Sequence, residues 1–346
     1  MSIVYRKAGL RLARGIPTSQ TLVQALQRDL RRLGYLRSGL DGQFGQGTEQ
    51  AVRSLQWDLL FNNGTGTDGA APVPMTSYNS GRVAAIDGVL DERLATCLED
   101  ILADDRVPSL PRSARPATDN QRALDQVRSL DHAPVPVPFL LAILGQESGC
   151  QHFRVPTAGD TDSFIVVGLD RNDPAHPDHI SSRGYGIGQY TLFHHPPRPE
   201  EVETLMLDPV RNVERAMREL ADKFDHFVMG GTPATRADDR IDEIGTGPLR
   251  HCRYAIDDPR YLRDCRRCAI DAGSLSIGPG SRLRSGSPEL LTPTQYHPET
   301  RYADVPDRAR LGCDWPYATR RYNGSGLNSY HYQFQVLHRL LSGPGV

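Results

Sequence analysis

The apolar run 140–144 is followed within three residues by the carboxylate of Glu147. A run of this length is too short to cross a bilayer, so the sequence predicts a buried helix that ends near Glu147. Apolar surroundings and the negative end of the helix dipole both disfavour a charged carboxylate there, so its pKa is expected to be raised. A carboxylic acid that keeps its proton near neutral pH can donate it to a glycosidic oxygen. Glu147 is therefore a candidate general acid, and the simpler interpretation is a half-exposed residue after a core helix.

The chain has 346 residues, of which 38% are hydrophobic and 24% charged, which is enough for two or three domains with buried cores. Its net charge is −2, so no overall field attracts nucleic acid or acidic membranes. No segment is apolar enough to span a membrane, and residues 1–14 lack the apolar stretch of a secretory signal. We therefore expect a protein made in the cytoplasm that reaches the periplasm or cell wall by non-classical export, injection or lysis.

Helical spacing is clear near the N-terminus. Residues 22–33 repeat Leu and Val at intervals of three and four, with Thr18 and Ser19 as helix N-caps and Gly34 as the helix end. Thr48 is the expected N-cap of a second helix. The pattern predicts two consecutive amphipathic helices.

Two Asp-Gly turns, Asp41-Gly42 and Asp87-Gly88, precede the second and a third helix. Glycine permits backbone angles that other residues avoid, and an aspartate side chain can bond to the amides of its own turn. The stretch 62–81 between them is rich in Gly, Asn, Thr, Ser and Pro and predicts an exposed loop.

This arrangement resembles the three-helix type of peptidoglycan-binding domain over residues 18–103, although the insertion between Gln56 and Ile86 is longer than in that family. The residues that carry the resemblance are Val23, Leu26, Gln27, Leu30, Leu33, Gly34, Tyr35, Asp41, Gly42, Phe44, Gly45, Thr48, Ala51, Val52, Leu55, Gln56, Asp87 and Gly88. The resemblance implies a small three-helix bundle that binds peptidoglycan in a shallow groove beside the two turns. The wall-binding candidates that it implies are Asp41, Gly42, Phe44 and Asp87.

Residues 104–119 contain three prolines among Ser, Arg and Asp and predict a stiff linker. A second domain is expected to span residues 120–346. In it, Pro138 fits the first turn of the helix that leads to Glu147.

Three motifs follow in order in this second region: Glu147-Ser148, then Gly-Ile-Gly-Gln at 186–189, then Tyr322-Asn323-Gly at 322–324. They resemble the motifs of the lytic transglycosylase and goose-type lysozyme superfamily. The chain departs from that family at Gly188, where Met is common, and at Arg321, where Ala is common. The spacing from the first motif to the second is also longer than usual.

This second resemblance implies a mainly α protein whose catalytic domain has an α+β lysozyme-like fold with a small β element. It implies that Glu147 cleaves the β-1,4 bond between N-acetylmuramic acid and N-acetylglucosamine, giving 1,6-anhydro products without a cofactor or metal. The residues that it places along the substrate cleft are Ser148, Gln189, Tyr190, Tyr322 and Asn323. The combination of modules resembles phage endolysins and injected antibacterial toxins, for which an immunity or export protein is a further candidate partner.

Alternatives remain open at this point. A hydrolytic muramidase would need a second carboxylate to activate water, and the acidic loop offers Asp160, Asp162, Asp170 and Asp173. A wall-anchoring protein with an inactive lysozyme-like domain would need none of this chemistry.

Three cysteines lie close together in the sequence, at Cys252, Cys265 and Cys268. The last two have the spacing of a zinc-binding pair, but one close pair is weak evidence for zinc. A structural disulfide is the expectation that we rank above a zinc subdomain that binds a partner.

Overall fold

The computed structural model describes residues 3–37, 39–129, 134–158, 160–229, 249–265, 312–324 and 327–342. The chain divides into two compact units. Unit 1 consists of Met1–Ala123 and Gln151–Asn212, and unit 2 consists of Leu124–Cys150 and Val213–Val346. Each unit is therefore assembled from two stretches that are separated in the sequence.

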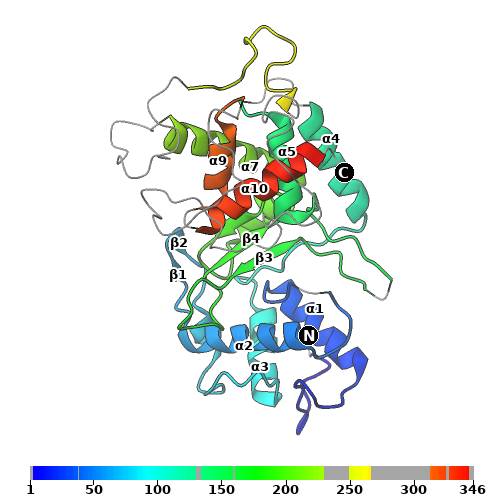
Figure 1. The fold of residues 1–346 in the computed structure, drawn as a ribbon. Helices are drawn as coiled ribbons and strands as arrows, with labels where there is room; N and C mark the ends of the chain where they lie inside the picture. Colours follow the sequence, from blue (N-terminus) through cyan, green and yellow to red (C-terminus); the bar gives the residue numbers. More distant parts are fainter. Residues whose placement is uncertain are drawn as a thin grey trace. The chain divides into compact units, whose positions relative to one another are not determined.

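Unit 1 combines helices with two small antiparallel sheets, which Figure 1 shows in blue to green. Its elements are α1 (Gln20–Arg32), α2 (Gln46–Phe61), β1 (Thr65–Gly66), β2 (Gly69–Ala70), η1 (Met75–Tyr78), α3 (Glu92–Ala103), the first half of α4 (Pro116–Ser129), β3 (Val167–Asp170), β4 (Ser182–Tyr185), β5 (Tyr190–Leu192), α6 (Pro199–Glu201), the π-helical segment η2 (Val202–Met206) and the first residues of α7 (Pro209–Lys223). In each chain segment, local sequence signals decide where the main helices begin and end.

Helix α1 forms as its apolar spacing predicts. It buries one face of Leu and Val side chains, begins after Ser19, and ends where Gly34 adopts φ +79. The amide of Tyr35 closes the helix end by donating to the Leu30 carbonyl at 2.9 Å. The prediction for the second helix was wrong in one detail, because α2 begins after Gly45 and Thr48 lies within its first turn.

The insertion 62–81 is not simply an exposed loop. It forms the β1–β2 hairpin and the short helix η1, and Val73, Met75 and Tyr78 join the hydrophobic core of the three helices. Asp68 in the hairpin turn accepts hydrogen bonds from the Phe193 amide at 2.8 Å and from the His194 ring at 2.9 Å. The insertion therefore adds core and fixed polar contacts to unit 1.

Unit 1 also contains a three-stranded antiparallel sheet in the order β3-β4-β5. Val167 pairs with Tyr185 and Tyr185 pairs with Tyr190, so the buried Tyr185 lies at the centre of the sheet. The sheet has its own core, and Leu169 packs against both this core and that of the helices. Helices α1–α3 and the sheet are therefore continuous in packing.

A buried ion pair reinforces that continuity. Arg31 of α1 and Asp162 have no exposed side-chain surface, and Arg31 Nε lies 3.0 Å from Asp162 Oδ2. The guanidinium of Arg31 also donates to the carbonyls of Leu36 at 2.7 Å and Ile165 at 3.1 Å. Burial lowers the pKa of Arg31 to about 10, and the neighbouring Asp162 opposes that shift, so Arg31 keeps its charge at neutral pH.

The division into units differs from the predicted domain boundaries. The segment 104–119, predicted as a linker, packs inside unit 1: the Leu110 amide donates to the Arg32 carbonyl at 2.8 Å, and the Ser113 amide donates to the Ser163 carbonyl at 3.0 Å. Residues 151–212, predicted as part of the second domain, also belong to unit 1. Proline content suggested a spacer, but Val107 and Leu110 supply apolar side chains that the core buries.

Unit 2 is helical in its described residues. Its elements are the second half of α4, α5 (Val137–Ser148), the greater part of α7, the π-helical segment η3 (Phe224–Val228), α9 (Trp315–Tyr322) and α10 (Leu327–Ser342). Helix α10 packs against α5 and α9, and the ring of Phe224 lies 4.2 Å from that of the buried Trp315. None of the helices in the described parts of the chain is long and apolar enough to cross a membrane.

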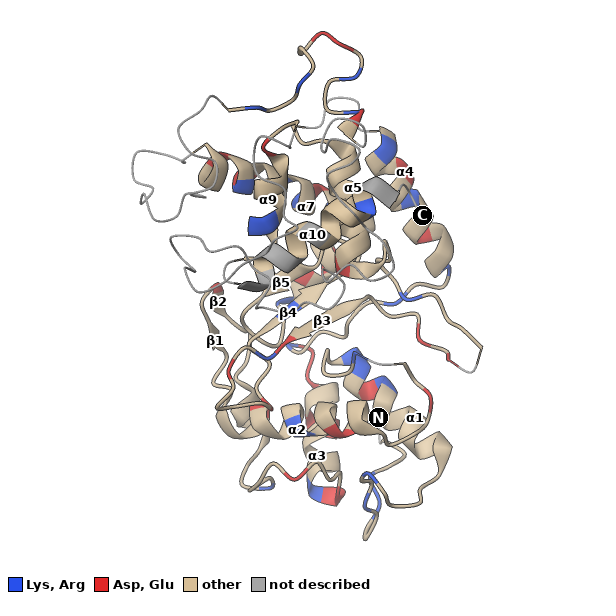
Figure 2. Cartoon of the chain, viewed as in Figure 1, with Lys and Arg blue, Asp and Glu red and all other residues tan. Residues whose placement is uncertain are grey.

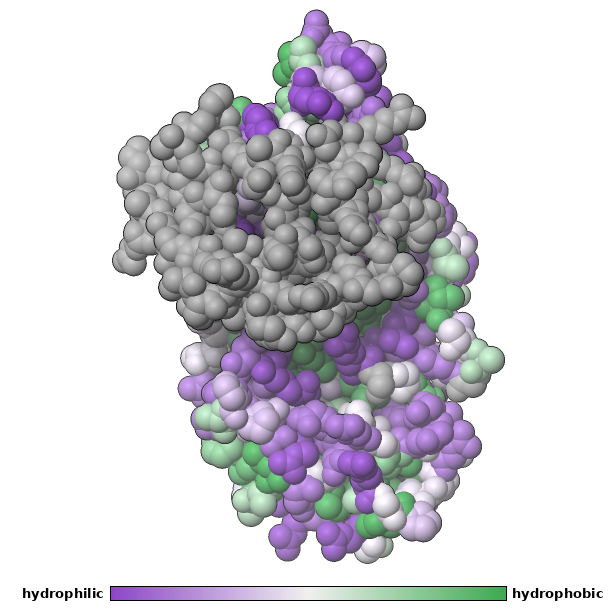
Figure 3. Space-filling view, in the orientation of Figure 1, coloured by the Kyte–Doolittle hydropathy of each residue, from purple (hydrophilic) through white to green (hydrophobic). Residues whose placement is uncertain are grey.

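The described residues agree with the prediction of a mainly α protein with few strands. The last five residues of α1 include Arg28, Asp29, Arg31 and Arg32. Figure 2 shows charges of both signs on this helix. The face of unit 1 seen in Figure 3 is mainly hydrophilic, with small separate hydrophobic areas. Polar groups therefore dominate what this face offers to a ligand.

Candidate functional site

The first Asp-Gly turn is held by a glutamine from α1. Buried Gln27 donates from Nε2 to Asp41 Oδ1 at 2.8 Å and accepts from the Gly42 amide at 2.8 Å. Asp41 Oδ1 also accepts from the Gln43 amide at 2.9 Å. Gly42 adopts φ +74, a conformation that side chains other than glycine rarely reach, so the turn needs glycine here.

The second turn repeats this arrangement with residues of α2. Buried Gln56 donates to Asp87 Oδ1 at 2.7 Å and accepts from the Gly88 amide at 2.9 Å. Asp87 Oδ1 accepts from the Val89 amide at 3.0 Å, and Gly88 also has φ +74. The module therefore contains the same glutamine clamp twice, once before α2 and once before α3.

These contacts give the predicted wall-binding residues a structural role. Asp41 and Asp87 are exposed, but each uses Oδ1 to hold its own turn, and Gly42 supplies the backbone angle. Phe44 is partly buried and packs against the core of the helices. That they also bind peptidoglycan stays a prediction.

The glutamine clamps make a testable contribution to stability. Replacing Gln27 or Gln56 by Leu leaves a buried glycine amide without its acceptor, and we expect each change to lower the free energy of unfolding by about 2 kcal/mol. Urea unfolding followed by fluorescence measures this loss. Gln43→Leu, at an exposed side chain of the same turn, is the matched control and should cost less than about 0.5 kcal/mol. Equal costs for Gln27 and Gln43 would contradict the clamp.

In unit 2, Glu147 lies in the last turn of α5, as predicted, with Pro138 in the first turn and Gly149 as the C-cap. Its side chain is half-buried. The hydroxyl of Tyr332 in α10 donates to Glu147 Oε1 at 2.5 Å. The carboxyl group is thus held in place by a second helix of the same unit.

Tyr322, at the end of α9, also lies near this carboxyl group. Burial, followed by the charges of Glu219 and Glu147, raises the pKa of Tyr322 well above its ordinary value. Burial and Glu147 do the same for the pKa of Tyr332, so both phenols stay protonated at neutral pH. Glu219 on α7 is the second carboxylate whose charge reaches both rings.

The remaining predicted cleft residues divide between the two units. Ser148 and Asn323 belong to unit 2; the Ser148 hydroxyl donates to the Leu144 carbonyl at 3.0 Å, and Asn323 is the exposed C-cap of α9. Gln189 and Tyr190 belong to unit 1. The structure therefore brings Tyr322 close to Glu147, while Gln189 and Tyr190 are described within their own unit.

Gln189 has a defined local role. It adopts φ +51, in the left-handed region that favours glycine, and its Nε2 donates to the Gly186 carbonyl at 2.7 Å. Its side-chain amide therefore satisfies the backbone of its own turn. A non-glycine residue in such a conformation often marks a functional loop, and a role in substrate binding stays a prediction.

Two buried polar side chains form hydrogen bonds to the backbone of that loop. Asn212 accepts from the Gly188 amide at 2.8 Å and donates to the Tyr185 carbonyl at 3.0 Å. The His152 ring lies 2.8 Å from the Met206 carbonyl through Nε2 and accepts from the Ile187 amide at 3.3 Å through Nδ1. Because a carbonyl only accepts and an amide only donates, His152 is the neutral tautomer with its proton on Nε2.

His152 makes unit 1 sensitive to acid. Burial lowers the pKa of His152 to about 4, below the ordinary value of about 6.5, so the folded state binds a proton less readily than the unfolded chain. Its contribution to stability is complete above pH 6.5 and is lost as the pH falls toward 4. We expect a loss of about 2 kcal/mol between pH 7.5 and pH 5 from this residue, and His195, whose pKa is also lowered by burial, adds in the same direction.

Urea unfolding at the two pH values, in a Trp315→Phe background so that Trp57 reports on unit 1, measures this dependence. His152→Asn keeps an amide donor and acceptor but cannot titrate, so its stability should change less with pH. If both proteins lose the same stability, His152 is not the source.

The carboxylates proposed for a hydrolytic base all have local partners. Asp162 is paired with Arg31 and Arg154, and Asp160 accepts from the Leu40 and Asp162 amides. Farther along, Asp170 accepts from the Ser182 hydroxyl at 2.9 Å, and Asp173 lies 2.7 Å from the His176 ring. These contacts give all four residues a structural explanation within unit 1.

Of the three cysteines that lie close together in the sequence, Cys268 lies outside the described residues. Cys97 and Cys150 are buried and are not joined in disulfides. Among the residues that the structure describes, no group of three His, Cys, Asp or Glu side chains is arranged to hold a metal ion.

Two residues that the structure makes prominent were not predicted from the sequence. Tyr332 contacts Glu147, and the buried positions Tyr332, Val336 and Leu340, which recur every four residues, are the signal in the sequence that places it on the inner face of α10. Arg31 is buried against Asp162, and nothing local in the sequence marks that distant partner.

Residues 19–64 match the protein family described as "Putative peptidoglycan binding domain". The chain therefore contains a peptidoglycan-binding module, as its motifs predicted. The match ends in the insertion, and α3 completes the same hydrophobic core. No curated protein and no solved structure matched the chain.

Proposed function

We propose that this protein cleaves the glycan strands of peptidoglycan between N-acetylmuramic acid and N-acetylglucosamine, with Glu147 as the catalytic acid and base. The observation that carries the proposal is the position of Glu147: it is half-buried at the end of an apolar helix, bonded to Tyr332 and close to Tyr322. A peptidoglycan-binding module in the same chain supplies the substrate class. Binding by that module raises the local concentration of glycan at the catalytic unit.

The chemistry needs one carboxyl group. Glu147 donates its proton to the glycosidic oxygen as the bond from that oxygen to C1 of the muramic acid breaks. The 6-hydroxyl oxygen of the same sugar then bonds to C1, and its proton returns to Glu147. The product is a 1,6-anhydro end, no water is consumed, and the catalyst is restored.

We favour this reaction over hydrolysis because the carboxylates of the acidic loop already bond to other groups of the protein. Asp162 is fully buried in an ion pair, and Asp160, Asp170 and Asp173 bond to neighbouring groups of unit 1. A muramidase needs a carboxylate that is available to activate water. The site of action is the periplasm or cell wall, where the polymer is.

Mass spectrometry of the muropeptides released from purified sacculi tests the proposal. We expect fragments with anhydromuramic ends, each lighter by one water than the hydrolytic product. Fragments with reducing ends would assign a muramidase instead. Release of no fragments by a protein that sediments with sacculi would support a wall-anchoring function and overturn the enzymatic proposal.

A further inference from the structure

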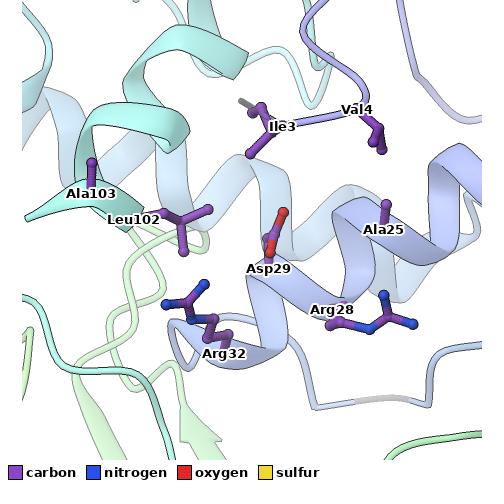
Figure 4. A pocket seen from close by; sticks show the side chains of 8 residues that line it. All are labelled: Ile3, Val4, Ala25, Arg28, Asp29, Arg32, Leu102 and Ala103. Atoms are coloured by element: carbon purple, nitrogen blue, oxygen red, sulfur yellow. The ribbon is translucent and has the colours of Figure 1, made fainter. Parts of the chain in front are cut away.

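A pocket of about 270 Å³ lies in unit 1 between the N-terminal arm, α1 and α3 (Figure 4). Its apolar walls are Ile3 of the arm, Ala25 of α1 and Leu102 of α3. Ile3 and Leu102 lie outside residues 19–64, which match the peptidoglycan-binding family. This volume is slightly below the roughly 300 Å³ of the smallest typical small-molecule sites. A pocket of this size suits one small polar group on a short aliphatic stem.

Asp29 presents a carboxylate at the middle of this pocket (Figure 4). The hydroxyl of the buried Tyr5 donates to Asp29 Oδ2 at 2.6 Å, and burial keeps the pKa of Tyr5 well above its ordinary value, so Tyr5 remains a donor. Among the described residues, Asp29 Oδ1 has no hydrogen-bond partner. Burial also raises the pKa of Asp29, and a cation that binds beside Asp29 would lower that pKa again.

Two arginines line the same pocket. Arg32 uses Nε to donate to the Ser109 hydroxyl at 2.5 Å, while its terminal nitrogens have no partner among the described residues. Arg28 is exposed and, within the described part of the chain, makes no ion pair. Neither arginine approaches Asp29 closely enough to form an ion pair with it. The pocket therefore offers an acceptor for a cation and donors for an anion at the same time.

We propose that this pocket binds the zwitterionic end of a stem-peptide side chain, in which one carbon carries both an ammonium and a carboxylate, as in diaminopimelate. Asp29 accepts from the ammonium, Arg28 and Arg32 bind the carboxylate, and the methylene stem lies against Ile3, Ala25 and Leu102. A lysine side chain brings an ammonium without the carboxylate, and an amidated diaminopimelate lacks the negative charge. The inference rests on the proposed function in taking peptidoglycan as the ligand.

Isothermal titration of the full chain with the soluble tripeptide L-Ala-γ-D-Glu-diaminopimelate tests the assignment. We expect binding that weakens by about tenfold or more with the lysine tripeptide, with the amidated peptide, and in Asp29→Asn. Asp29→Asn keeps an oxygen that accepts from Tyr5, and Ala25→Leu fills the pocket without changing its charges, so both should bind weakly while melting like the wild type. Arg93→Gln, at an exposed arginine outside the pocket, controls for loss of a positive charge.

The outcomes separate this inference from the proposed enzyme. Equal binding of the lysine and diaminopimelate peptides, or unchanged binding by Asp29→Asn and Ala25→Leu, overturns the zwitterion assignment. The zwitterion assignment is also overturned if the wild-type protein fails to bind the tripeptide yet sediments with sacculi and releases muropeptides. That result would leave the proposed function standing. Muropeptide release that is lost in Glu147→Gln, with tripeptide affinity retained, supports both.

Discussion

Glu147→Gln is expected to reduce the release of muropeptides from purified sacculi by roughly a hundred- to ten-thousand-fold, the range typical for loss of a general acid and base. The substitution is nearly isosteric, and the amide oxygen can still accept from Tyr332, whose hydroxyl lies 2.5 Å from the carboxyl group. It removes the transferable proton while leaving the helix end and its neighbours in place. Chromatography and mass spectrometry of the soluble products measure the rate directly.

Two controls make that result specific. Glu219→Gln changes the other carboxylate whose charge reaches Tyr322 and Tyr332, and we expect it to keep most of the activity. Sedimentation with sacculi should be the same for the wild type and both variants, because the peptidoglycan-binding module lies in residues 19–64. An active Glu147→Gln protein would remove the basis for the enzymatic proposal.

Asp162→Asn should be among the most destabilising single substitutions in unit 1, lowering the free energy of unfolding by about 3–5 kcal/mol. Asn can still accept from the Phe164 amide at the position that Asp162 Oδ1 uses, so the change removes mainly the charge. The guanidinium of Arg31 would then remain buried without its counterion, and it cannot readily lose its proton. Urea unfolding followed by Trp57 fluorescence, in the same Trp315→Phe background, measures the loss.

Removing both members of the pair gives the sharper comparison. Arg31→Met combined with Asp162→Leu should be more stable than Asp162→Asn alone, because no uncompensated charge is left in the interior. Asp105→Asn, at an exposed aspartate of the same unit, should change stability by less than about 0.5 kcal/mol. A small effect of Asp162→Asn would show that water or Asp160 compensates the charge on Arg31.

Local signals predicted the helices well. Periodic Leu and Val residues defined α1, Gly34 ended α1, and Pro138 entered the first turn of α5 before Glu147. The peptidoglycan-binding module was also recognisable, because its turns and core positions recur at fixed spacing in the sequence. Each of these features depends on residues that lie close together along the chain.

Features that depend on distant partners were not predictable in this way. Arg31 is buried only because Asp162, 131 positions later, compensates its charge. Tyr332 reaches Glu147 across 185 positions, and no short motif records that contact. The same reason explains the domain boundaries: composition marks 104–119 as proline-rich, whereas the contacts of Leu110 are set by packing with α1.

The interleaved order of the two units limits how this protein can be divided. A fragment ending at residue 119 would lack residues 151–212, so Arg31 would lose Asp162 and the sheet that shares its packing would be missing. A fragment beginning at residue 120 would carry that sheet without the helices it packs against. The wall-binding module is thus not an interchangeable cassette in this chain, and exchanging it for another would require its companion segment to travel with it.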